Sequence, residues 1–478
     1  MNDLTLLSYL KMRVEKEPEK RLLGGEAGWL SACRVLHTVE NIGRSLLSLG
    51  TQPGDLAAVR AERGVDTALL ILGMRAAGLV AVLTDPRQKI DEVLSDCEAE
   101  LHPRAKLERR ADGAFSVTID GVEHFLSLSD DTPDVSLPQT SPYAPAFVIF
   151  TSGSTGKSKA VVQCENNYIS NLQDSAPLGY YREDDVALGA LPLEHVFGLV
   201  LLAGVAVLGY SLFFPGNTGI SSLLDCIRRE RITRMNGVPS LYLAMAEKSG
   251  SYNLSSLRAG FIGGGPVTAA QFSRIEETLG MTLIPVYGLS ESVGVSCASY
   301  LDPRAERAAG VGRVYPMNTL RILSPEGREA APGQEGEICV RGPMRMLGYA
   351  GNPLEPEDFF PTGDLGWLDR QGVLHLSGRK KDILIRNGNN LSPRRIEDAL
   401  LSLPQVRAAA VVGLPDERQG ETPWAMIVGR ADETALHTLL HKNEWPEGIL
   451  SVEQLPMTAS GKPDKQKIRE VLLAWRNG

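Results

Sequence analysis

The segment 151–159, TSGSTGKSK, combines glycines, hydroxyl side chains and lysines directly after the apolar run AFVIF. Glycines allow backbone N–H groups to approach anionic oxygens, Ser and Thr hydroxyls add donors, and lysines supply positive charge. A loop of this composition after a strand is suited to bind phosphate. The alternative is a solvated turn.

Two other catalytic motifs match this chain only in part. The nucleotide-binding pattern GxxxxGK[ST] fits its second half to 156–158, but its first glycine would fall on Thr151. The nucleophile elbow G-x-S-x-G begins at Gly288, but its last glycine would fall on Ser292. Both near misses make a P-loop nucleotidase and a serine hydrolase poorer interpretations than a distinct phosphate-binding loop.

The elements that must position this loop follow an alternating order. From about residue 145 the apolar runs AFVIF, SLFFP, RAGFI and TLIPVYG alternate with helical patterns that begin at Glu165 and cover 220–230 and 267–279. This order favours an α/β fold with parallel strands, crossover helices on both faces and ligands at the carboxyl ends of the strands. We predict a large N-terminal domain of layered α/β sheets.

The C-terminal part has a different pattern. Short strands joined by Asp/Gly turns are predicted within 336–384, and Ser392 followed by proline is typical of a helix start. Two strand-like runs, RAAAVVG and WAMIVG, come next, before two further helical patterns. The prediction is therefore a small α+β domain on a hinge, with domains at 1–380 and 381–478.

The composition excludes several classes of protein. Asp and Glu total 58 against 49 Lys and Arg, so the net charge is −9, and without a basic run nucleic acid is not expected as a partner. With 43% apolar and 22% charged residues the chain is a globular protein. Six dispersed cysteines without a CxxC predict buried thiols. His437 and His441, which have no third ligand nearby, are expected to be a surface pair.

Two segments bear on location. The N-terminus is charged within a dozen residues and lacks a basic n-region and a cleavage site, which predicts a cytoplasmic protein. The run 196–214 carries no charge and is long enough to span a bilayer. Glycines interrupt this run, however, Pro215 ends it and no Lys or Arg flanks it, so a buried helix leading into a strand at 210–214 is predicted instead of a membrane span.

Seven motifs in order resemble the acyl- and aryl-adenylating (AMP-forming) superfamily, which includes acyl-CoA synthetases, peptide-synthetase adenylation domains and firefly luciferase. The motifs are TSGSTGKSK at 151–159, LPLEHVFG at 191–198, GGGP at 263–266, YGLSES at 287–292, TGDLGWLD at 362–369, GRKKDILIRNGNNLSPRRIE at 378–397 and PMTASGKPDK at 456–465. The segment 72–85, LGMRAAGLVAVLTD, also resembles this family, so the resemblance covers nearly the whole chain. It is closest to acyl- and aryl-CoA ligases.

The resemblance implies a ligase that acts in two steps. A carboxylate would first attack the α-phosphorus of ATP, releasing pyrophosphate, and the thiol of coenzyme A would then attack the acyl-adenylate. Glu291 is implied to hold Mg²⁺ on the phosphates. Tyr287 would lie against the adenine, and Asp364 and Arg379 would contact the ribose. The residues implied to bind ATP or AMP are Thr151, Ser152, Gly153, Ser154, Thr155, Gly156, Lys159, Gly263, Gly264, Gly265, Tyr287, Gly288, Ser290, Asp364 and Arg379.

Three positions near the C-terminus carry further implied roles. Lys462 resembles the lysine that bridges the carboxylate and the α-phosphate during adenylation. Because one closed geometry cannot serve both steps, a domain rotation is implied, with Lys381 at its hinge. Gly388 would then line the pantetheine tunnel. The chain departs from the family pattern at Ser158, Ser290 and Asn387, where proline, threonine and glycine are usual.

The kind of acid is predicted from His195 and the residues that follow it. His195 is implied to gate the acid pocket as a catalytic residue, together with Lys462 and Glu291. Amino-acid-activating members usually place an aspartate shortly after this histidine, and none occurs before Phe214, so a small fatty or aromatic acid fits better than an α-amino acid, whose ammonium would be unpaired.

Two other functions stay open from the sequence. The chain ends soon after Lys462, which leaves no room for a fused carrier domain, but phosphopantetheine on a separate carrier protein could replace coenzyme A. A nucleotide-binding regulatory protein without turnover is the other alternative, and the presence of Glu291, Asp364, Arg379 and Lys462 argues against it. The oligomeric state is open.

Overall fold

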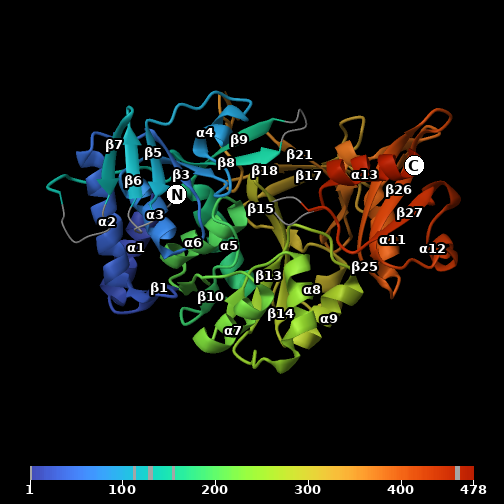
Figure 1. Cartoon of the computed structure of the whole chain (residues 1–478), viewed down its shortest axis with the longest axis horizontal. Coiled ribbons are helices and arrows are strands. Elements are labelled where there is room, and N and C mark those ends of the chain that lie inside the picture. The colour runs from blue at the N-terminus through green and yellow to red at the C-terminus, as the bar shows by residue number, and fades with distance from the viewer. Residues whose placement is uncertain (1–2, 111–114, 127–132, 153–156, 458–462, 478) are drawn as a thin grey trace.

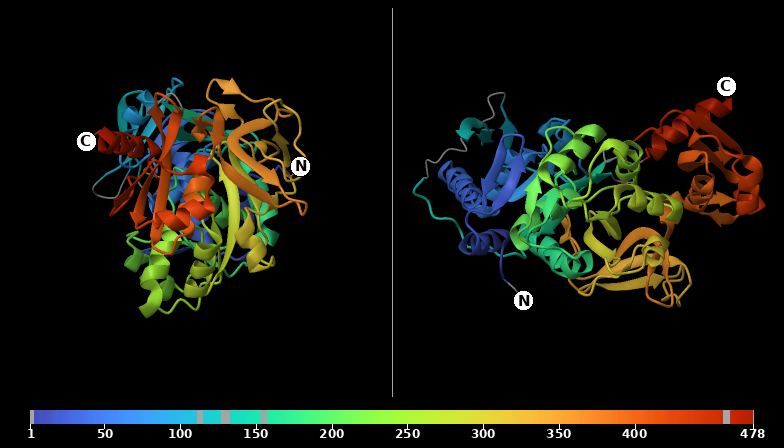
Figure 2. Two further views of the ribbon diagram at one scale, coloured as in Figure 1. Left: turned by 90° about the vertical axis from the view of Figure 1, so that its right-hand side faces the viewer. Right: turned by 90° about the horizontal axis from the view of Figure 1, so that it is seen from below.

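Two large sheets, with helices between and around them, form most of the molecule, and a smaller sheet with three helices lies at its C-terminal end (Figure 1). The right-hand view in Figure 2 places the red C-terminal elements at one end of the long axis and the blue N-terminal ones toward the other. The chain is thus an α/β protein with a small C-terminal α+β domain. The computed structural model describes residues 3–110, 115–126, 133–152, 157–457 and 463–477.

The first nine-stranded sheet is mostly parallel. Its strands in order are β16 (Arg313–Val314), β15 (Ser292–Cys297), β14 (Thr282–Leu289), β13 (Ala259–Ile262), β12 (Arg234–Met235), β10 (Val186–Leu188), β11 (Ser211–Phe213), β1 (Arg21–Gly25) and β2 (Gly28–Ser31). The strands from β14 to β1 are parallel, as predicted, and the edge strands β15, β16 and β2 are antiparallel to their neighbours.

The second nine-stranded sheet holds the phosphate-loop segment. Its strands in order are β20 (Asn352–Pro353), β19 (Gly348–Tyr349), β9 (Ser158–Cys164), β8 (Pro145–Ser152), β4 (Val80–Thr84), β3 (Leu56–Arg60), β5 (Ala105–Arg109), β6 (Phe115–Ile119) and β7 (Val122–Leu126). The predicted strand β8 pairs parallel with β4, whereas β9, which was not predicted from the sequence, pairs antiparallel with β8. Too few residues separate β8 from β9 for a crossover connection, so these two strands can be neighbours only in the antiparallel direction.

Helices cover both large sheets and the five-stranded C-terminal sheet. Their bounds are α1 (Leu6–Lys16), α2 (Ala32–Ser48), α3 (Val65–Ala76), α4 (Ile90–Ser95), α5 (Glu165–Gly179), α6 (Val196–Val207), α7 (Ile220–Glu230), α8 (Pro239–Lys248), α9 (Ala269–Leu279), α10 (Arg304–Ala309), α11 (Pro393–Ser402), α12 (Glu433–Leu439) and α13 (Lys465–Asn477). The main core joins α2, α3, α5 and α6 with residues of both large sheets, and a second core packs α7, α8 and α9 on the first sheet.

The alternation of side chains along β4 shows how these cores arise. Ala81 and Leu83 belong to the main core, whereas Val80 and Val82 belong to a separate cluster with α4 on the other face of the sheet. The apolar run 196–214 forms the buried helix α6 and the strand β11, which confirms that prediction. Among the described residues, no helix combines the length and the apolar character that crossing a membrane requires.

The C-terminal part contains two smaller sheets. The four-stranded one contains β17 (Thr319–Leu323), β18 (Gly336–Arg341), β21 (Phe360–Leu368) and β22 (Leu374–Arg379). The five-stranded one contains β24 (Asn389–Leu391), β23 (Leu384–Arg386), β26 (Gly420–Gly429), β25 (Val406–Asp416) and β27 (Gly448–Val452). Its two faces are covered by α11 with α12 and by α13. A short 3₁₀ turn at Lys380–Asp382 connects the two sheets.

Some local predictions need correction. Cys33 is exposed, although the other five cysteines are buried thiols as predicted. Ser392 occupies the N-cap position of α11, but its hydroxyl donates to the Ser377 carbonyl at 2.6 Å instead of accepting from the helix. In the predicted surface pair of histidines, His437 stacks on the Trp445 ring, with 3.8 Å between the ring centroids. Among the described residues, no cluster of three or more His, Cys, Asp or Glu side chains could hold a metal ion by itself.

Candidate active site

The two strands of the phosphate-loop hairpin hold its ends at a defined position. Thr151 pairs with Lys159 and Ser152 with Ser158 across β8 and β9. Both the amide and the hydroxyl of Ser158 donate to the Asp96 carbonyl, at 3.0 and 3.2 Å. A proline, which is usual at this position, has no backbone N–H and could not donate the hydrogen bond that the Ser158 amide donates. The predicted residues Gly153, Ser154, Thr155 and Gly156 lie outside the described residues.

Glu291 is held at the tip of a tight hairpin beside the phosphate-loop strands. Leu289 pairs with Ser292, so Ser290 and Glu291 form the turn between β14 and β15. The Tyr349 hydroxyl donates to Glu291 Oε1 at 2.9 Å. The same tyrosine belongs to β19, which pairs directly with β9.

Lys159 lies on the other side of this tyrosine. Its Nζ is 5.0 Å from the centre of the Tyr349 ring, within cation–π range. Burial, followed by the charge of Glu291, raises the pKa of the Tyr349 hydroxyl above its usual range, so it remains a donor. Tyr349 therefore connects the last lysine of the phosphate loop to the carboxylate of Glu291.

A second chain of contacts joins three predicted residues from different elements. Tyr287 on β14 donates its hydroxyl to Asp364 Oδ2 at 2.7 Å. Arg379 approaches the other oxygen, with Nε 3.1 Å from Oδ1. Asp364 and Arg379 face each other across β21 and β22. Burial, with a smaller contribution from Asp364, raises the pKa of Tyr287 well above its usual range.

Glycines allow the chain to pass close to neighbouring strands at the end of β13. A Cβ atom on Gly263 would lie 2.9 Å from Val286 Cγ2, and Gly264 has a φ of +78°, which disfavours other residues. Gly265 follows in the same turn, and Gly288 lies on β14 just before the Ser290–Glu291 turn. The structure therefore places these four glycines along the ends of β13 and β14.

His195 lies at the start of α6, next to the phosphate-loop hairpin. It is the N-cap residue, and its carbonyl accepts from the Leu199 amide at 3.0 Å. Together with Thr151 and Ser158 it lines a hollow of about 300 Å³. The structure thus brings His195 and both ends of the phosphate loop to one cavity.

Three residues of the C-terminal region were predicted to act in the reaction, and two of them lie on the surface. Lys381 is exposed in the 3₁₀ turn between β22 and β23. Gly388 is exposed, has a φ of +75° and has no atom within 4 Å of its ideal Cβ position. Asn387, where glycine is usual, has a φ of 50°, a conformation that asparagine tolerates. Lys462 lies outside the described residues.

The sequence did not single out two residues that belong to this region. Tyr349 lies in a short edge strand, and only its pairing with β9 brings it to Glu291. Glu194 precedes His195 in the motif LPLEHVFG and lines the same hollow. A charged residue in an otherwise apolar segment was the available signal for Glu194.

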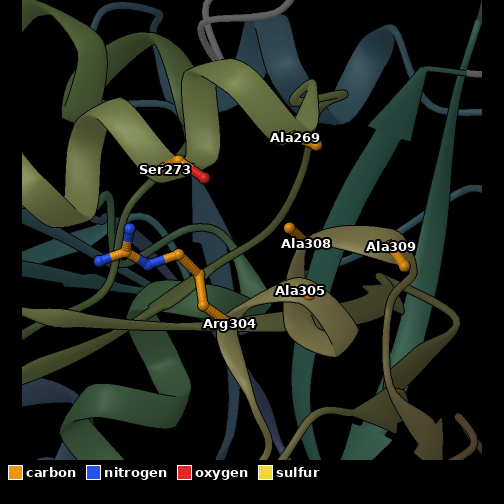
Figure 3. Close-up of a pocket in the computed structure, with 6 residues that line it drawn as sticks. All are labelled: Ala269, Ser273, Arg304, Ala305, Ala308 and Ala309. Atoms are coloured by element: carbon orange, nitrogen blue, oxygen red, sulfur yellow. The ribbon is translucent and has the colours of Figure 1, made fainter.

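A larger hollow, of about 600 Å³, lies away from all these residues, between α9 and α10 (Figure 3). Small side chains, such as Ala269, Ala305 and Ala308, account for most of its lining. Its one charged side chain, Arg304, already forms ion pairs with Glu276 and Glu277 at 2.9 and 2.5 Å. None of the predicted site residues lines it.

Comparisons with known proteins agree along the whole chain. Residues 10–350 match the family described as AMP-binding enzyme, and residues 395–462 match its C-terminal domain. In an alignment 497 positions long, the chain is 30% identical to the sulfoacetate–CoA ligase of Cupriavidus necator, and 97% of each chain is covered. It is also 30% identical over 475 residues to a feruloyl-CoA synthase from an Amycolatopsis species, with 93% of this chain and 94% of that one covered.

Among solved structures, the o-succinylbenzoate CoA synthetase (MenE) of Bacillus subtilis, in complex with its acyl-adenylate intermediate, superposes with a TM-score of 0.84. The two sequences are 23% identical, and the comparison covers 98% of this chain and 99% of the other. At this identity the likeness concerns the fold. The arrangement of the large sheets and the C-terminal domain is therefore one already seen with an adenylate bound.

Proposed function

The chain belongs to the AMP-binding enzyme family of acyl- and aryl-adenylating enzymes, and from this premise we infer that it is an ATP-dependent acid–CoA ligase. In the first step the acid's carboxylate attacks the α-phosphorus of ATP, pyrophosphate leaves and an acyl-adenylate forms. In the second step the thiol of coenzyme A takes the acyl group and AMP leaves. Relatives that cover nearly the whole chain carry the names of CoA ligases, which supports coenzyme A as the acceptor.

The observation that carries the proposal is the link from Lys159 through Tyr349 to Glu291. At the base of the phosphate loop, the Glu291 carboxylate lies 2.9 Å from the Tyr349 hydroxyl and the Lys159 ammonium lies 5.0 Å from the centre of the same ring. In our assignment the segment 151–159 holds the β- and γ-phosphates and then the departing pyrophosphate. Positive charge and N–H donors there would offset negative charge that gathers on the leaving group.

Glu291 fits a magnesium ion. Mg²⁺ prefers oxygen ligands, retains several waters and is usually bound by one or two carboxylates together with substrate phosphates. Glu291 supplies such a carboxylate at the tip of a hairpin, and Tyr349 is its side-chain partner among the described residues. When bound, the ion would supply positive charge to the triphosphate. Tyr349 orients the carboxylate for this purpose.

Asp364 is the proposed ribose ligand. In the structure, one of its oxygens accepts a hydrogen bond from Tyr287 and the other forms an ion pair with Arg379. Ribose hydroxyls are donors and would take one of these places. Arg379 is the partner more readily displaced, because 51% of its side chain is exposed, whereas Tyr287 is buried. Tyr287 would then hold Asp364 in place while presenting its ring to the adenine.

The second step calls for a different arrangement of the C-terminal domain. We propose a boundary between residues 380 and 381, with Lys381 at the hinge, because the 3₁₀ turn there is exposed and lies between two separate sheets. Lys462 would act in adenylation, and the loop at Gly388 would line the pantetheine path after rotation. Exposure of Gly388 and the open space around it are compatible with such a contact.

The acid is proposed to be a small carboxylic acid that is not an α-amino acid. Fatty and aromatic acids are both compatible with the apolar residues at the start of α6, such as Val196 and Phe197, which pack on the main core. No aspartate stands between His195 and Phe214 to pair with an ammonium group. The relatives' names differ in the acid, so the choice must be made by experiment.

An acid panel tests the proposal. The purified chain is incubated with Mg²⁺, ATP and labelled pyrophosphate, and with ferulate, sulfoacetate, o-succinylbenzoate, octanoate or phenylalanine. We expect acid-dependent ATP–pyrophosphate exchange with at least one of the first four, and a thioester when coenzyme A is added. Absence of exchange with every acid would contradict the proposal. Exchange followed by transfer to a phosphopantetheinylated carrier protein, but not to coenzyme A, would assign the chain to carrier loading instead.

A further inference from the structure

The hollow beside His195 contains a carboxyl group that the steps above do not use. The hollow lies between the ends of β4 and β8 and the start of α6. Its lining includes Thr151 and Ser158 from the phosphate-loop hairpin, and His195 and Glu194 from the segment before α6. Glu194 therefore lies in the same cavity as residues assigned to ATP and to the acid.

Glu194 is not held as a structural ion pair. Its Oε2 is buried and has no hydrogen-bond partner among the described residues. Two arginines lie close enough to influence it, but each is engaged elsewhere. Arg87 donates to the Asp85 carboxylate at 2.5 and 2.9 Å, and Arg63 donates to the Ala190 carbonyl at 2.8 Å. The carboxyl of Glu194 is thus available to a ligand in the hollow.

Burial sets the ionisation of this carboxyl. It raises the pKa of Glu194 to about 7. A hydrogen bond from the backbone amide of Glu194 itself opposes the increase, as do the two arginines, whereas Asp85 adds to it. The charged or titratable groups that face Glu194 or line the hollow with it are Asp85, Asp96, Arg63, Arg87 and His195. A carboxyl that titrates near neutral pH can accept a proton and release it again in each turnover.

The proposed second step needs a proton acceptor. A thiol of the cysteine type has a pKa of about 8.5, and the thiolate is the nucleophile, so most of the coenzyme A thiol is unreactive at neutral pH. The hollow's volume, about 300 Å³, corresponds to roughly ten water molecules at liquid density, which is ample for a thioethyl group. Apolar side chains, among them Leu83, Val93 and Phe150, complete a lining suited to methylene groups.

We propose that this hollow receives the thiol end of coenzyme A and that Glu194 is the general base for thioester formation. The S–H bond breaks as the carboxylate of Glu194 takes the proton, and the sulfur forms a bond to the acyl carbon. The bond from that carbon to the phosphate oxygen breaks, and its electron pair leaves with AMP. Glu194 afterwards releases the proton to solvent. This inference rests on the ligase function proposed above.

The position of the hollow supports this assignment over a role in adenylation. In adenylation the attacking group is a carboxylate, which carries no proton to remove, so a base has nothing to do in that step. The thiol is the one proton-bearing nucleophile of the reaction. His195 is the residue that the family resemblance implies at the gate of the acid pocket, so a base next to it lies where we expect the acyl carbon of the adenylate.

The two half-reactions test the role of Glu194 separately. Glu194→Gln preserves the shape and removes the base, and Glu194→Asp preserves the base. Glu123→Gln is a matched acid-to-amide control at an exposed position on β7, outside the lining of the hollow. Each variant is given the panel acid with the highest exchange rate. Pyrophosphate exchange reports adenylation, and single-turnover transfer from the preformed adenylate to coenzyme A is measured from pH 5.5 to 9.5.

For the parent enzyme we expect transfer to increase through pH 7 and then level off. Glu194→Gln should reduce transfer at pH 7 by about 10²-fold or more, the scale of general-base catalysis. The transfer rate of Glu194→Gln should then rise about tenfold per pH unit as the pH approaches the pKa of the thiol. Its rate of ATP–pyrophosphate exchange should stay within about threefold of the parent's. Glu194→Asp should recover part of the transfer rate, and the surface control Glu123→Gln should behave like the parent.

Several outcomes would overturn the assignment of Glu194. Transfer by Glu194→Gln with the parent's rate and pH profile would exclude the base, while the ligase function would stand. Equal losses in exchange and transfer would indicate a structural role instead. If the parent itself gave neither exchange nor transfer, the proposed function would fail, and the assignment of Glu194 would fail with it.

Discussion

Replacing Tyr349 with Phe removes one hydroxyl from the link between the phosphate loop and Glu291 and leaves the ring in place. The hydrogen bond that is lost spans 2.9 Å and ends on a carboxylate. Hydrogen bonds to charged groups contribute about 1.5–3 kcal/mol. Glu291 is only half-buried, so water would replace part of the bond, and the lower value applies. A loss of about 1.5 kcal/mol corresponds to roughly a tenfold change in an equilibrium constant.

This loss should appear in the magnesium dependence of adenylation. Without its donor, the Glu291 side chain gains rotational freedom, and ordering it again on binding costs free energy. We expect Tyr349→Phe to raise the Mg²⁺ concentration needed for half-maximal ATP–pyrophosphate exchange about tenfold. At saturating Mg²⁺ the exchange rate should return to within about twofold of the parent.

Tyr349→Leu is the companion variant, because it also removes the ring near Lys159. A cation–π contact at 5.0 Å contributes about 0.5–1 kcal/mol at a partly exposed site. The Leu variant should therefore show the same magnesium shift and, in addition, a severalfold higher KM for ATP. An unchanged magnesium titration for the Phe variant would refute the link between Tyr349 and Glu291. A fall that persists at saturating Mg²⁺ would refute an orienting role.

Three further variants test other parts of the structure. Lys462→Ala should abolish pyrophosphate exchange but spare transfer from a supplied acyl-adenylate to coenzyme A, and equal loss of both steps would contradict its assigned role. Lys381→Pro should spare exchange and block thioester formation, because proline fixes the torsion φ at the hinge; normal thioester formation would exclude this hinge. Glu165→Gln should lower the thermal midpoint by several degrees. The Nε atom of the buried Arg75 lies 2.9 Å from Glu165 Oε1, and the substitution removes the counter-charge of this arginine at a cost of about 3–5 kcal/mol. A midpoint within one degree of the parent's, by differential scanning fluorimetry, would show that the pair contributes little.

Local patterns predicted several of the helices and strands after residue 145. The helix expected at 220–230 is α7 as observed, because its apolar residues recur at a helical period and bury one face. The helix expected at 267–279 begins two residues later, where Thr268 accepts from the Gln271 amide and caps it. Boundaries of this kind depend on individual capping bonds, which a pattern does not resolve.

Pairing between distant segments was harder to predict. Tyr287 and Asp364 were both expected at the nucleotide, but the hydrogen bond between them joins positions 77 residues apart. Resemblance of motifs predicts which residues belong to one site, but it does not predict which of them form hydrogen bonds with one another. Tyr349 shows the same limit, since it reaches Glu291 only because a two-residue edge strand adds to β9.

The ionisation of Glu194 also could not be predicted from its neighbours in the chain. The groups that act on its pKa are Asp85, Arg87 and Arg63, which come from two separate loops more than 100 positions away. Burial among these loops, which is the largest cause of the shift, exists only after folding.

The proposed ribose ligand lies close in the chain to the proposed hinge. Asp364 and Arg379 face each other on β21 and β22, and the turn that contains Lys381 begins at the next residue. Backbone pairing of β21 with β22 holds both residues in the proposed large domain, whether or not their side chains touch. Because Tyr287 has its own hydrogen bond to Asp364 and is buried, we expect a bound ribose to displace the Arg379 guanidinium alone. Under the proposed assignment, nucleotide binding therefore changes the contacts of a side chain two residues before the hinge, while the strands that carry it stay paired.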